Sequence, residues 1–432
     1  MTRRYSAYKA SGVEWLGEVP EGWKLGKFRH LFKESAEKIE AEVVGVMLSV
    51  SGYRGIEIKE YDDENRKRTD EDLEGYRIVR PGQLVVNTMW LNYAGLGVSA
   101  HEGHVSPAYR SYDFRGGLEL RYAHHLLRSS IYVTGYTQLL TGVRPNSLQM
   151  SRNDLMDFPV LVPPLPEQRA IAGFLDRETA KIDALVAEQR HLIDLLREKR
   201  QAVISHAVIK GLNPKAPLKP SGIDWLGDVP EGWEVRKLSK LFSARKGPRG
   251  QQLTKEYCGA HSGDFPVYSG QTEDFGVMGA IDDFDFDTGH EGVIFSTTVG
   301  AKAMSVSHIF DRFSLLQNCM IIQSKDSRAL TRFFFYQLQP LFAYFRRQIP
   351  EHMQASFRIG DLYAFQIVIP SKNEQFEIAA YLDAVTAKLD ALTATADSAI
   401  TLLQERRAAL VSAAVTGKID VRALAPTETE AA

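Results

Sequence analysis

The stretch SGVEWLGEVPEGW at residues 11–23 decides how this chain is organised, because it is written again as SGIDWLGDVPEGW at residues 221–233. Ten of the thirteen positions are identical, and the other three exchange Val for Ile or Glu for Asp. The offset between the copies is 210 residues. Trp-Leu-Gly and Glu-Gly-Trp are not generic sequences, so we interpret the chain as an internal duplication.

A second repeated stretch lies further along each half. Residues 167–185 read EQRAIAGFLDRETAKIDAL and residues 374–392 read EQFEIAAYLDAVTAKLDAL, with twelve of nineteen positions identical at an offset of 207. The residues between the repeats, 24–160 and 234–367, do not match in this way. Each half therefore has a short lead-in, a variable region and a repeated helical segment. The scaffold is duplicated, while the region that it carries differs.

The repeated segments predict two long helices. They are rich in Ala, Leu, Glu, Arg and Lys, and Gly211 and Gly417 follow them as stop signals. A helix of about 42 residues is about 60 Å long, which exceeds the diameter of one variable region. Its heptad-like apolar stripe needs a partner, and the simplest partner is the other helix in an antiparallel coiled coil. Packing of each helix on its own domain alone is the alternative. The predicted seam consists of Leu175, Ile182, Leu185, Leu192, Leu196 and Val203 in the first helix and Leu382, Leu389, Leu392, Leu403 and Leu410 in the second.

The variable regions are predicted to be globular domains with a mixed or antiparallel sheet. They contain short β-forming runs bounded by Gly, Asp, Asn and Pro, and they share only faint echoes, such as LVVNTMW (84–90) opposite VIFSTTV (293–299). The predicted fold class is α/β (α+β), with two globular domains alternating with two long helices in a pseudo-two-fold repeat. The predicted boundaries are 1–160 for the first domain with its lead-in, 161–215 for the first helix, 216–369 for the second domain, 370–420 for the second helix and 421–432 for a disordered tail.

Composition restricts the class of protein. The 432 residues are 44% hydrophobic and 25% charged, which is typical of a chain that buries a core. The two cysteines, Cys258 and Cys319, are too few for a disulfide framework, so a reducing cytoplasm is expected. We expect neither a signal peptide nor a membrane helix. The net charge of −2 argues against a simple DNA binder, unless only part of the surface meets DNA or a partner supplies most phosphate contacts.

The order of these parts resembles the specificity subunits of Type I restriction-modification systems. The resemblance rests on the duplicated lead-in ending in Pro-Glu-Gly-Trp (20–23, 230–233) and on VPPLPEQ (162–168) at the start of the long helix, and it spans the whole chain. The second copy departs from the motif, because IPSKNEQ (369–375) has Ser-Lys-Asn in place of Pro-Leu-Pro. We expect this change to make the start of the second helix less rigid.

The resemblance implies a non-catalytic DNA-reading subunit. Members of this family carry two target-recognition domains, each reading one half of a split, asymmetric site on double-stranded DNA, and their paired helices set the unread gap. They dock two methyltransferase subunits, which bind S-adenosylmethionine and modify adenine N6, and restriction/translocase subunits, which use ATP and Mg. The resemblance thus implies no cofactor in this chain itself and no membrane partner.

Candidate DNA contacts are Arg, Lys, Asn, Gln, Thr and aromatic residues in the variable regions, because such side chains can reach base edges. In the first domain they are Asn87, Thr88, Trp90, Asn92, Tyr109, Arg110, Arg144 and Asn146, and in the second Lys246, Arg249, Gln251, Gln271, Thr297, Thr298, Lys302, Arg346, Arg347 and Gln354. Trp15, Trp23, Trp225 and Trp233 recur unchanged in both halves, whereas readers of different sequences should differ, so we interpret them as structural anchors.

Two other functions remain open at this point. A solitary DNA-modifying enzyme is disfavoured, because the one Pro-Pro pair (163–164) lacks the flanking polar and aromatic residues of an adenine-binding loop. The sequence also lacks a GxxxxGK[ST] phosphate loop, and His101 and His104 are too close for a zinc pair on a helix. A coiled-coil adaptor with two protein-binding heads is the second alternative, and the sequence does not distinguish it from a DNA reader.

Overall fold

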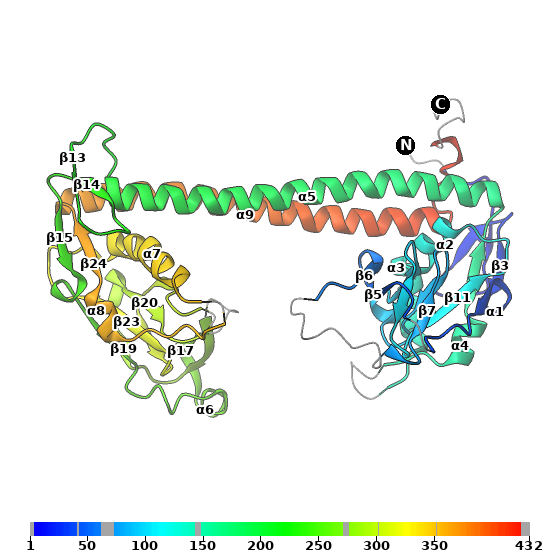
Figure 1. Cartoon of the computed structure of the whole chain (residues 1–432), viewed down its shortest axis with the longest axis horizontal. Coiled ribbons are helices and arrows are strands. Elements are labelled where there is room, and N and C mark those ends of the chain that lie inside the picture. Colours follow the sequence, from blue (N-terminus) through cyan, green and yellow to red (C-terminus); the bar gives the residue numbers. More distant parts are fainter. Residues whose placement is uncertain are drawn as a thin grey trace. The chain divides into compact units, whose positions relative to one another are not determined.

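The chain divides into two compact units in the computed structural model, which describes residues 4–40, 43–61, 73–142, 148–270, 276–300, 302–350 and 352–424. Unit 1 comprises Met1–Arg190 and Ser398–Ala432, and unit 2 comprises His191–Asp397 (Figure 1). Each unit therefore holds one variable domain, the start of one long helix and the end of the other.

In both units the lead-in forms a small hairpin, and the strand that follows it closes the variable domain. In unit 1, β3 pairs antiparallel with β12, so the first and last strands of the domain lie side by side. Strand β15 pairs with β24 in the same way in unit 2. These strands are β1 (Tyr8–Ala10), β2 (Glu18–Pro20), β3 (Lys24–Lys27) and β12 (Pro159–Val162) in unit 1, and β13 (Leu218–Pro220), β14 (Asp228–Pro230), β15 (Glu234–Lys237) and β24 (Gln366–Ile369) in unit 2.

The first variable domain has two four-stranded sheets. One is antiparallel, in the order β4-β11-β8-β9, and the other is mixed, in the order β6-β5-β10-β7, because β5 is parallel to β10. The strands are β4 (Phe32–Glu34), β5 (Val46–Ser51), β6 (Gly55–Ile58), β7 (Arg77–Val79), β8 (Leu84–Val86), β9 (Leu96–Val98), β10 (Gly103–Val105) and β11 (Arg110–Phe114). The helices are α1 (Phe28–Leu31), η3 (Leu91–Tyr93), α2 (Leu120–Leu127), α3 (Ser130–Leu139) and α4 (Arg152–Asp157).

The second variable domain repeats this topology. Its sheets have the orders β16-β23-β20-β21 and β18-β17-β22-β19, with β17 parallel to β22. The predicted α/β class with mixed and antiparallel sheets is confirmed. The strands are β16 (Phe242–Arg245), β17 (Ser262–Tyr268), β18 (Val277–Ile281), β19 (Phe286–Asp287), β20 (Val293–Thr297), β21 (Val306–Ile309), β22 (Arg312–Leu315) and β23 (Cys319–Ser324), and the helices are η5 (Leu238–Lys240), α6 (Lys255–Ala260), η7 (Gly289–Glu291), α7 (Thr331–Arg347) and α8 (Ile359–Ala364).

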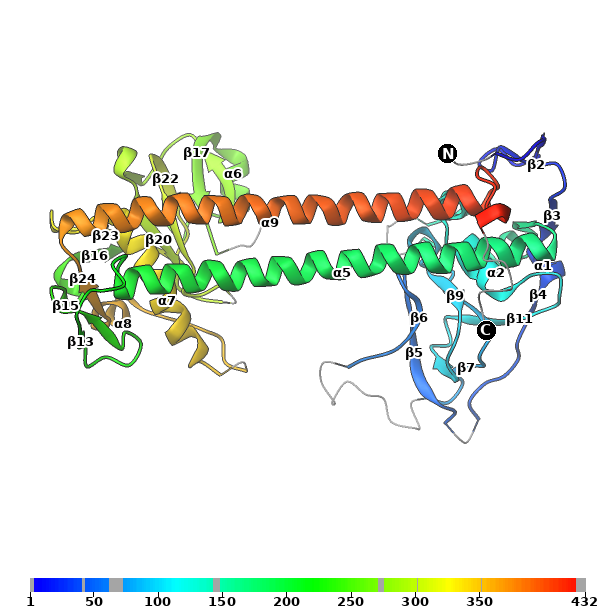
Figure 2. The same cartoon turned by 90° about the horizontal axis from the view of Figure 1, so that it is seen from above.

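The long helices are α5 (Leu165–Lys210) and α9 (Lys372–Val415), and they pack together (Figure 1, Figure 2). In unit 1 the end of α9 lies antiparallel to the start of α5, and Arg407 pairs with Asp183 at 3.0 Å. In unit 2 the end of α5 lies beside the start of α9, and Arg200 pairs with Asp390 at 3.1 Å. The coiled-coil prediction is therefore confirmed. Each helix also packs on the domains at its ends, since both contribute buried residues to both main cores.

The seam of this helix pair differs in part from the predicted one. Leu185, Leu192 and Leu392 are 45%, 42% and 54% exposed, so these three assignments are wrong. The neighbouring Val186 and Ile193 are buried instead. Alternating steps of four and three residues from Leu175 lead to Val186 and Ile193, whereas Leu185 and Leu192 each precede one of these positions by one residue and lie beside the buried face. Buried members of the observed seam are Leu175, Thr179, Ile182, Val186, Ile193 and Leu196 in α5 and Leu382, Thr386, Leu389 and Ala396 in α9, while Val203, Leu403 and Leu410 are half-buried.

The start of α9 has its own stabilising device. Ser371 Oγ accepts the backbone N–H of Glu374 at 3.3 Å, and the Glu374 carboxylate accepts the backbone N–H of Ser371 at 3.1 Å. This reciprocal pair is a capping box, which satisfies two backbone donors at the helix start. The Ser-Lys-Asn substitution therefore replaces the proline-rich start of α5 with a capped one. The lower rigidity expected at this helix start stays a prediction.

The C-terminal end of the described chain differs from the prediction. Residues 421–424, which we predicted to begin a disordered tail, are ordered: Val421 is fully buried and Arg422–Leu424 form a 3-10 turn (η8). The rest of that tail lies outside the described residues.

Among the residues that the structure describes, every helix is too short or too polar to cross a bilayer.

Candidate nucleic-acid interface

The duplicated tryptophans fasten each lead-in to the start of a long helix. Trp23 and Trp233 are 1% and 2% exposed. The Trp23 indole N–H donates to Glu167 Oε2 at 2.9 Å, and that of Trp233 donates to Glu374 Oε1 at 3.1 Å. Trp15 stacks on Phe158 and is half-buried, as is Trp225. The prediction that these residues are structural anchors is confirmed.

The glutamine after each of these glutamates joins the long helix to the variable domain by hydrogen bonds. Gln168 is fully buried, and its Nε2 donates to the carbonyls of Pro163 (2.8 Å) and Gly117 (3.0 Å). Its Oε1 accepts the backbone N–H of Glu119 at 2.7 Å. Gln375 makes the corresponding three bonds to Pro370, Arg328 and Leu330. The repeated Glu-Gln therefore fixes each domain on its helix.

A third repeated contact joins a helix of each variable domain to a repeated aspartate. Arg121 of α2 pairs with Asp176 at 3.0 Å, and His125 one turn later bonds to the same carboxylate at 2.8 Å. In unit 2, Arg332 and Tyr336 of α7 contact Asp383 in the same arrangement. The hydrogen bond from His125 lowers the pKa of Asp176 against the opposing effect of burial. Because the sequences of α2 and α7 differ, the match between the two halves of the chain does not reveal this contact.

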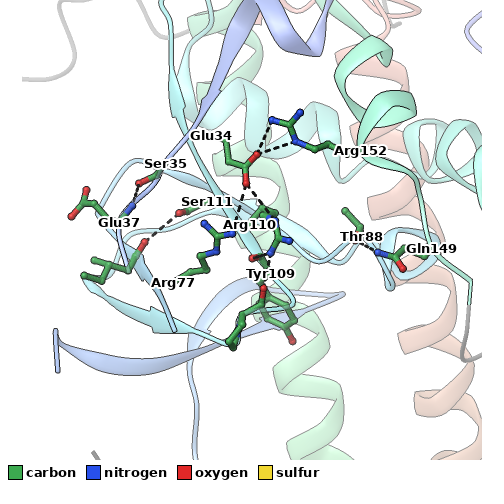
Figure 3. A network of polar contacts seen from close by, with 12 residues as sticks. Glu34, Ser35, Glu37, Arg77, Thr88, Tyr109, Arg110, Ser111, Gln149 and Arg152 are labelled. Carbon is green, nitrogen blue, oxygen red and sulfur yellow. Dashed lines mark hydrogen bonds and ion pairs between the residues drawn. The ribbon is translucent and has the colours of Figure 1, made fainter. Parts of the chain in front are cut away.

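The variable side chains gather elsewhere, around Glu34 at the end of β4 (Figure 3). Three arginines from separate elements pair with this one carboxylate: Arg152 at 3.1 Å, Arg110 at 3.4 Å and Arg77 at 3.9 Å. The pKa of the adjacent Tyr112 is raised to about 12, by burial first and by Glu34 second. Three guanidinium groups on one carboxylate leave a local excess of positive charge. We call Glu34, Arg77, Arg110 and Arg152 the arginine cluster.

Polar residues of the types that can contact DNA lie beside the arginine cluster, some of them buried. Tyr109 precedes Arg110, and its hydroxyl hydrogen-bonds to Asn87, while burial raises the pKa of Tyr109. Gln149 Nε2 donates to Thr88 Oγ1 at 3.3 Å (Figure 3). Sequence reasoning selected Asn87, Thr88, Tyr109 and Arg110 and missed Glu34, Arg77, Gln149 and Arg152. An acidic residue at the end of one strand, and single arginines at the starts of two other strands and a helix, carry no signal until the fold brings them together.

The second domain places its charges differently. Arg249 donates to Asp285 at 2.6 Å and to Asp283 at 3.0 Å, and the Asp285 side chain is only 3% exposed. The hydrogen bond to Asp285 is the main cause of the raised pKa of Arg249. Two carboxylates compensate this one guanidinium, so Arg249 has a structural role here. Lys246 is exposed in the same loop and remains a candidate contact.

Three predicted contacts are buried. Asn87, Thr297 and Thr298 are 4%, 2% and 1% exposed. Asn87 Oδ1 accepts the backbone N–H of Met89 at 3.2 Å, and Thr297 Oγ1 donates to the carbonyl of Lys302, so both side chains hold the loop that follows a strand. This burial indicates a packing role and argues against a DNA contact for all three. A polar residue just after a strand looks like a base-contacting residue in the sequence. The sequence does not show whether its side chain is buried against the loop or exposed to solvent.

The other predicted contacts vary in exposure. Trp90 is 57% exposed and lies against Tyr93, with ring centroids 5.6 Å apart, so it is not a core residue. Arg144, Asn146 and Gln271 lie outside the described residues. The exposed candidates are Trp90, Lys246, Gln251, Lys302, Arg347 and Gln354, and the half-buried ones are Thr88, Asn92, Tyr109, Arg110, Arg249 and Arg346.

A metal centre is not formed by the described residues, in which no three His, Cys, Asp or Glu side chains are placed to share an ion. His104, from the HEGH sequence, is buried, and its Nδ1 lies 3.0 Å from the carbonyl of Val44. What the described surface offers is arginine, amide, hydroxyl and aromatic groups. This chemistry suits contacts to phosphates and base edges.

Comparisons with known proteins point in one direction. A family model described as the Type I restriction modification DNA specificity domain matches residues 230–402. The type I specificity subunit S.MpnORF285P of Mycoplasma pneumoniae is 35% identical over 96 residues, which are 22% of this chain and 28% of that protein. The N-terminal part of a second such subunit from the same organism, S.MpnORF289P, is 32% identical over 138 residues, which are 31% of this chain and 70% of that protein.

A solved structure shares the fold over nearly the whole chain. It belongs to a study of complex assembly and conformational transition in the type I R-M system, and it aligns with a TM-score of 0.61. The alignment covers 93% of this chain and 99% of that one, at 16% sequence identity. Together with the sequence matches and the duplicated scaffold, it leads to one conclusion: the chain belongs to the family of Type I restriction-modification specificity subunits.

Proposed function

We propose that this chain is the DNA-reading subunit of a Type I restriction-modification complex, and that each variable domain reads one half of a bipartite, asymmetric DNA site. One observation carries the proposal. The two domains have the same strand order and the same three fastenings to the long helices, yet their polar side chains differ. Reading two different half-sites requires a shared scaffold that carries two different polar surfaces.

The long helices set the unread gap under this proposal. Helix α5 has 46 residues, which corresponds to about 69 Å at 1.5 Å per residue. Two modules that read one face of the duplex need a separation of about one helical turn, roughly 34 Å, or a multiple of it. A helix pair of this length can hold two domains at such a distance. The bonds of Gln168 and Gln375 fix each domain on the start of its own long helix, as a spacer requires.

Docked partners supply the chemistry and part of the affinity. Two methyltransferase subunits bring S-adenosylmethionine to adenine N6, and restriction subunits bring ATP and Mg, while this chain contributes recognition in the cytoplasm and no catalysis. The net charge of −2 fits this division, since subunits that flank the DNA can provide most of the phosphate contacts.

Binding of the purified methyltransferase complex to a set of genomic DNA fragments tests this function. We expect retention of a few fragments that share one split sequence, at salt concentrations that release the remainder, because non-specific binding weakens steeply with salt. An adaptor with protein-binding heads would retain all fragments alike or none. That outcome would overturn the proposal.

A further inference from the structure

The arginine cluster of the first domain has an apolar counterpart in the second. Glu34 lies opposite Tyr112 in the β4–β11 pair, and Ala244 lies opposite Ile322 in the β16–β23 pair. The offset is 210 in both strands, which is the offset of the lead-in. Ala244 therefore occupies the position of Glu34.

Two of the three arginines are replaced in the same way. Two residues before Tyr112 stands Arg110, and two residues before Ile322 stands Met320, which is fully buried. Helices α4 and α8 match at an offset of 207, since Ser151-Arg-Asn-Asp-Leu and Arg358-Ile-Gly-Asp-Leu precede Phe158 and Phe365. By this correspondence Glu34, Arg110 and Arg152 of the first domain become Ala244, Met320 and Ile359 of the second.

This replacement shows that the fold does not need charge at these positions. Ala244 and Met320 belong to the main core of unit 2, and Ile359 packs against it. The scaffold contacts occur in both copies, whereas the arginine cluster occurs in one. A charged network that the shared fold can do without, and that only one domain has, points to the task in which the domains differ.

Within the cluster the arginines are held to different degrees. Arg110 Nη1 donates to the carbonyls of Pro107 (2.6 Å) and Tyr109 (2.9 Å), and the Arg77 side chain is only 14% exposed. The Arg152 side chain is 69% exposed at the start of α4, and its Nε and Nη2 both donate to Glu34 Oε2. Asp154 in the same helix is bonded to Ser151 instead. Arg152 is thus the accessible guanidinium of the cluster. Its orientation is set by the Glu34 carboxylate, which Arg77 and Arg110 hold in place.

We propose that Arg152 reads a guanine in the half-site of the first domain and that Glu34 is the residue that positions it. The inference rests on the proposed function. A guanidinium fork matches O6 and N7 of guanine in the major groove, and this pairing is the commonest specific contact of arginine with DNA. Holding the fork in place before binding reduces the ordering cost of recognition.

The test uses Arg152→Ile, which introduces the residue that the second domain already carries at this position. Binding of the methyltransferase complex is measured on the wild-type site and on duplexes with single base changes in each half. We expect Arg152→Ile to reduce the discrimination at one G·C pair of one half-site by about 5- to 140-fold, which corresponds to the roughly 1–3 kcal/mol of a bidentate contact. The other half-site should be read as before. Glu34→Gln should weaken discrimination at the same G·C pair. A loss of discrimination at a different base pair would exclude a positioning role for Glu34.

Two further variants make the result decisive. Arg152→Lys keeps the charge and loses the planar fork, so a guanine contact predicts discrimination below that of the wild type at the same G·C pair. Wild-type discrimination in Arg152→Lys, with a uniform loss of affinity and a smaller salt dependence in Arg152→Ile, would mean a phosphate contact and overturn the inference. Arg29→Ser is the matched control, because Arg29 pairs with Asp157 of the same helix and its counterpart in the second domain is Ser239.

The failure of this inference is distinguishable from failure of the proposed function. If the wild-type complex reads a split site and Arg152→Ile reads it unchanged, only the inference is overturned. Thermal unfolding of each variant checks that the domain is intact. If the wild-type complex shows no sequence preference at all, the function itself is wrong.

Discussion

At the scale of single residues, the duplicated side chains stabilise the molecule and the unmatched ones are candidates for recognition. Gln168 and Gln375 each satisfy three backbone groups at a junction where helix and domain meet. Buried backbone groups that lose their partner cost about 1–3 kcal/mol. The repeated Glu-Gln is therefore explained by hydrogen bonds that a two-residue match in the sequence could not reveal.

Gln168→Ala should lower the free energy of unfolding by about 2–4 kcal/mol, because it leaves two carbonyls and one N–H without their partner. Urea denaturation followed by circular dichroism measures this. The control is Gln201→Ala, a half-exposed glutamine on the same helix, for which we expect a change within about 0.5 kcal/mol. Equal effects of the two substitutions would contradict the role of Gln168.

Asp176 should make stability depend on pH in a definite direction. Its pKa is lowered, mainly by the hydrogen bond from His125, so the folded form holds the carboxylate more firmly than the unfolded chain does. The resulting stabilisation is complete above the ordinary carboxyl pKa of about 4 and is lost as the pH falls through the lower folded-state value. Asp176→Asn should therefore be less stable than the wild type at pH 7, with the difference shrinking towards pH 3.

Denaturation curves at these two pH values check the prediction. Asp194, whose side chain is 66% exposed and pairs with Arg197 of its own helix, provides the control, and Asp194→Asn should show little difference at either pH. A difference for Asp176→Asn that stays constant between pH 7 and pH 3 would contradict the assignment.

At the scale of elements, the sequence predicts the long helices well and their packing faces less well. Repeat, composition and stop signals locate α5 and α9 to within a few residues. The choice between adjacent residues such as Leu185 and Val186 needs the seam over its whole length, because both are apolar and only one faces the partner helix. The variable strands are found only approximately: the echo that aligned Leu84 with Val293 is shifted by one, since strand register places Leu84 at the position of Ile294.

The corrected seam makes a sharp comparison possible. Val186→Ala should destabilise the protein by about 1–2 kcal/mol, because it removes buried methyl groups from the helix pair. Leu185→Ala removes more atoms from an exposed position and should change stability by no more than about 0.5 kcal/mol. Thermal or urea unfolding of both variants decides between the two registers, and a larger effect of Leu185→Ala would restore the heptad read from the sequence.

At the scale of the whole molecule, the chain closes on itself within each unit. The end of α9 returns to the first lead-in, where Gly417 approaches Trp23 and its carbonyl accepts the Tyr8 hydroxyl at 2.9 Å. The end of α5 meets Trp233 in the same way. Duplication and domain order could be predicted from the sequence, because repeats are visible in it. The recognition surface could not, because residues far apart in the chain, such as Glu34 and Arg152, compose it.

Insertion of one heptad into both helices, after Arg190 and after Asp397, should lengthen the unread gap. Seven helical residues add about 10 Å, or roughly three base pairs at 3.4 Å each, and a whole heptad preserves the seam. Sequencing of methylated bases in cells that carry the complex reports gap and half-sites together. We expect a changed gap and unchanged half-sites, and an unchanged gap would contradict the role of the helices as a spacer.

The most direct test of two separate readers exchanges one domain for a copy of the other. Residues 238–365 can replace residues 28–158, because each segment is closed by one backbone bond between its ends, Leu238 N–H to Phe365 and Phe28 N–H to Phe158. Mapping the methylated sites of cells with this chimera should show the second half-site twice, at the original spacing, with the first half-site gone. A site identical to that of the wild type, or one altered in both halves, would contradict the account.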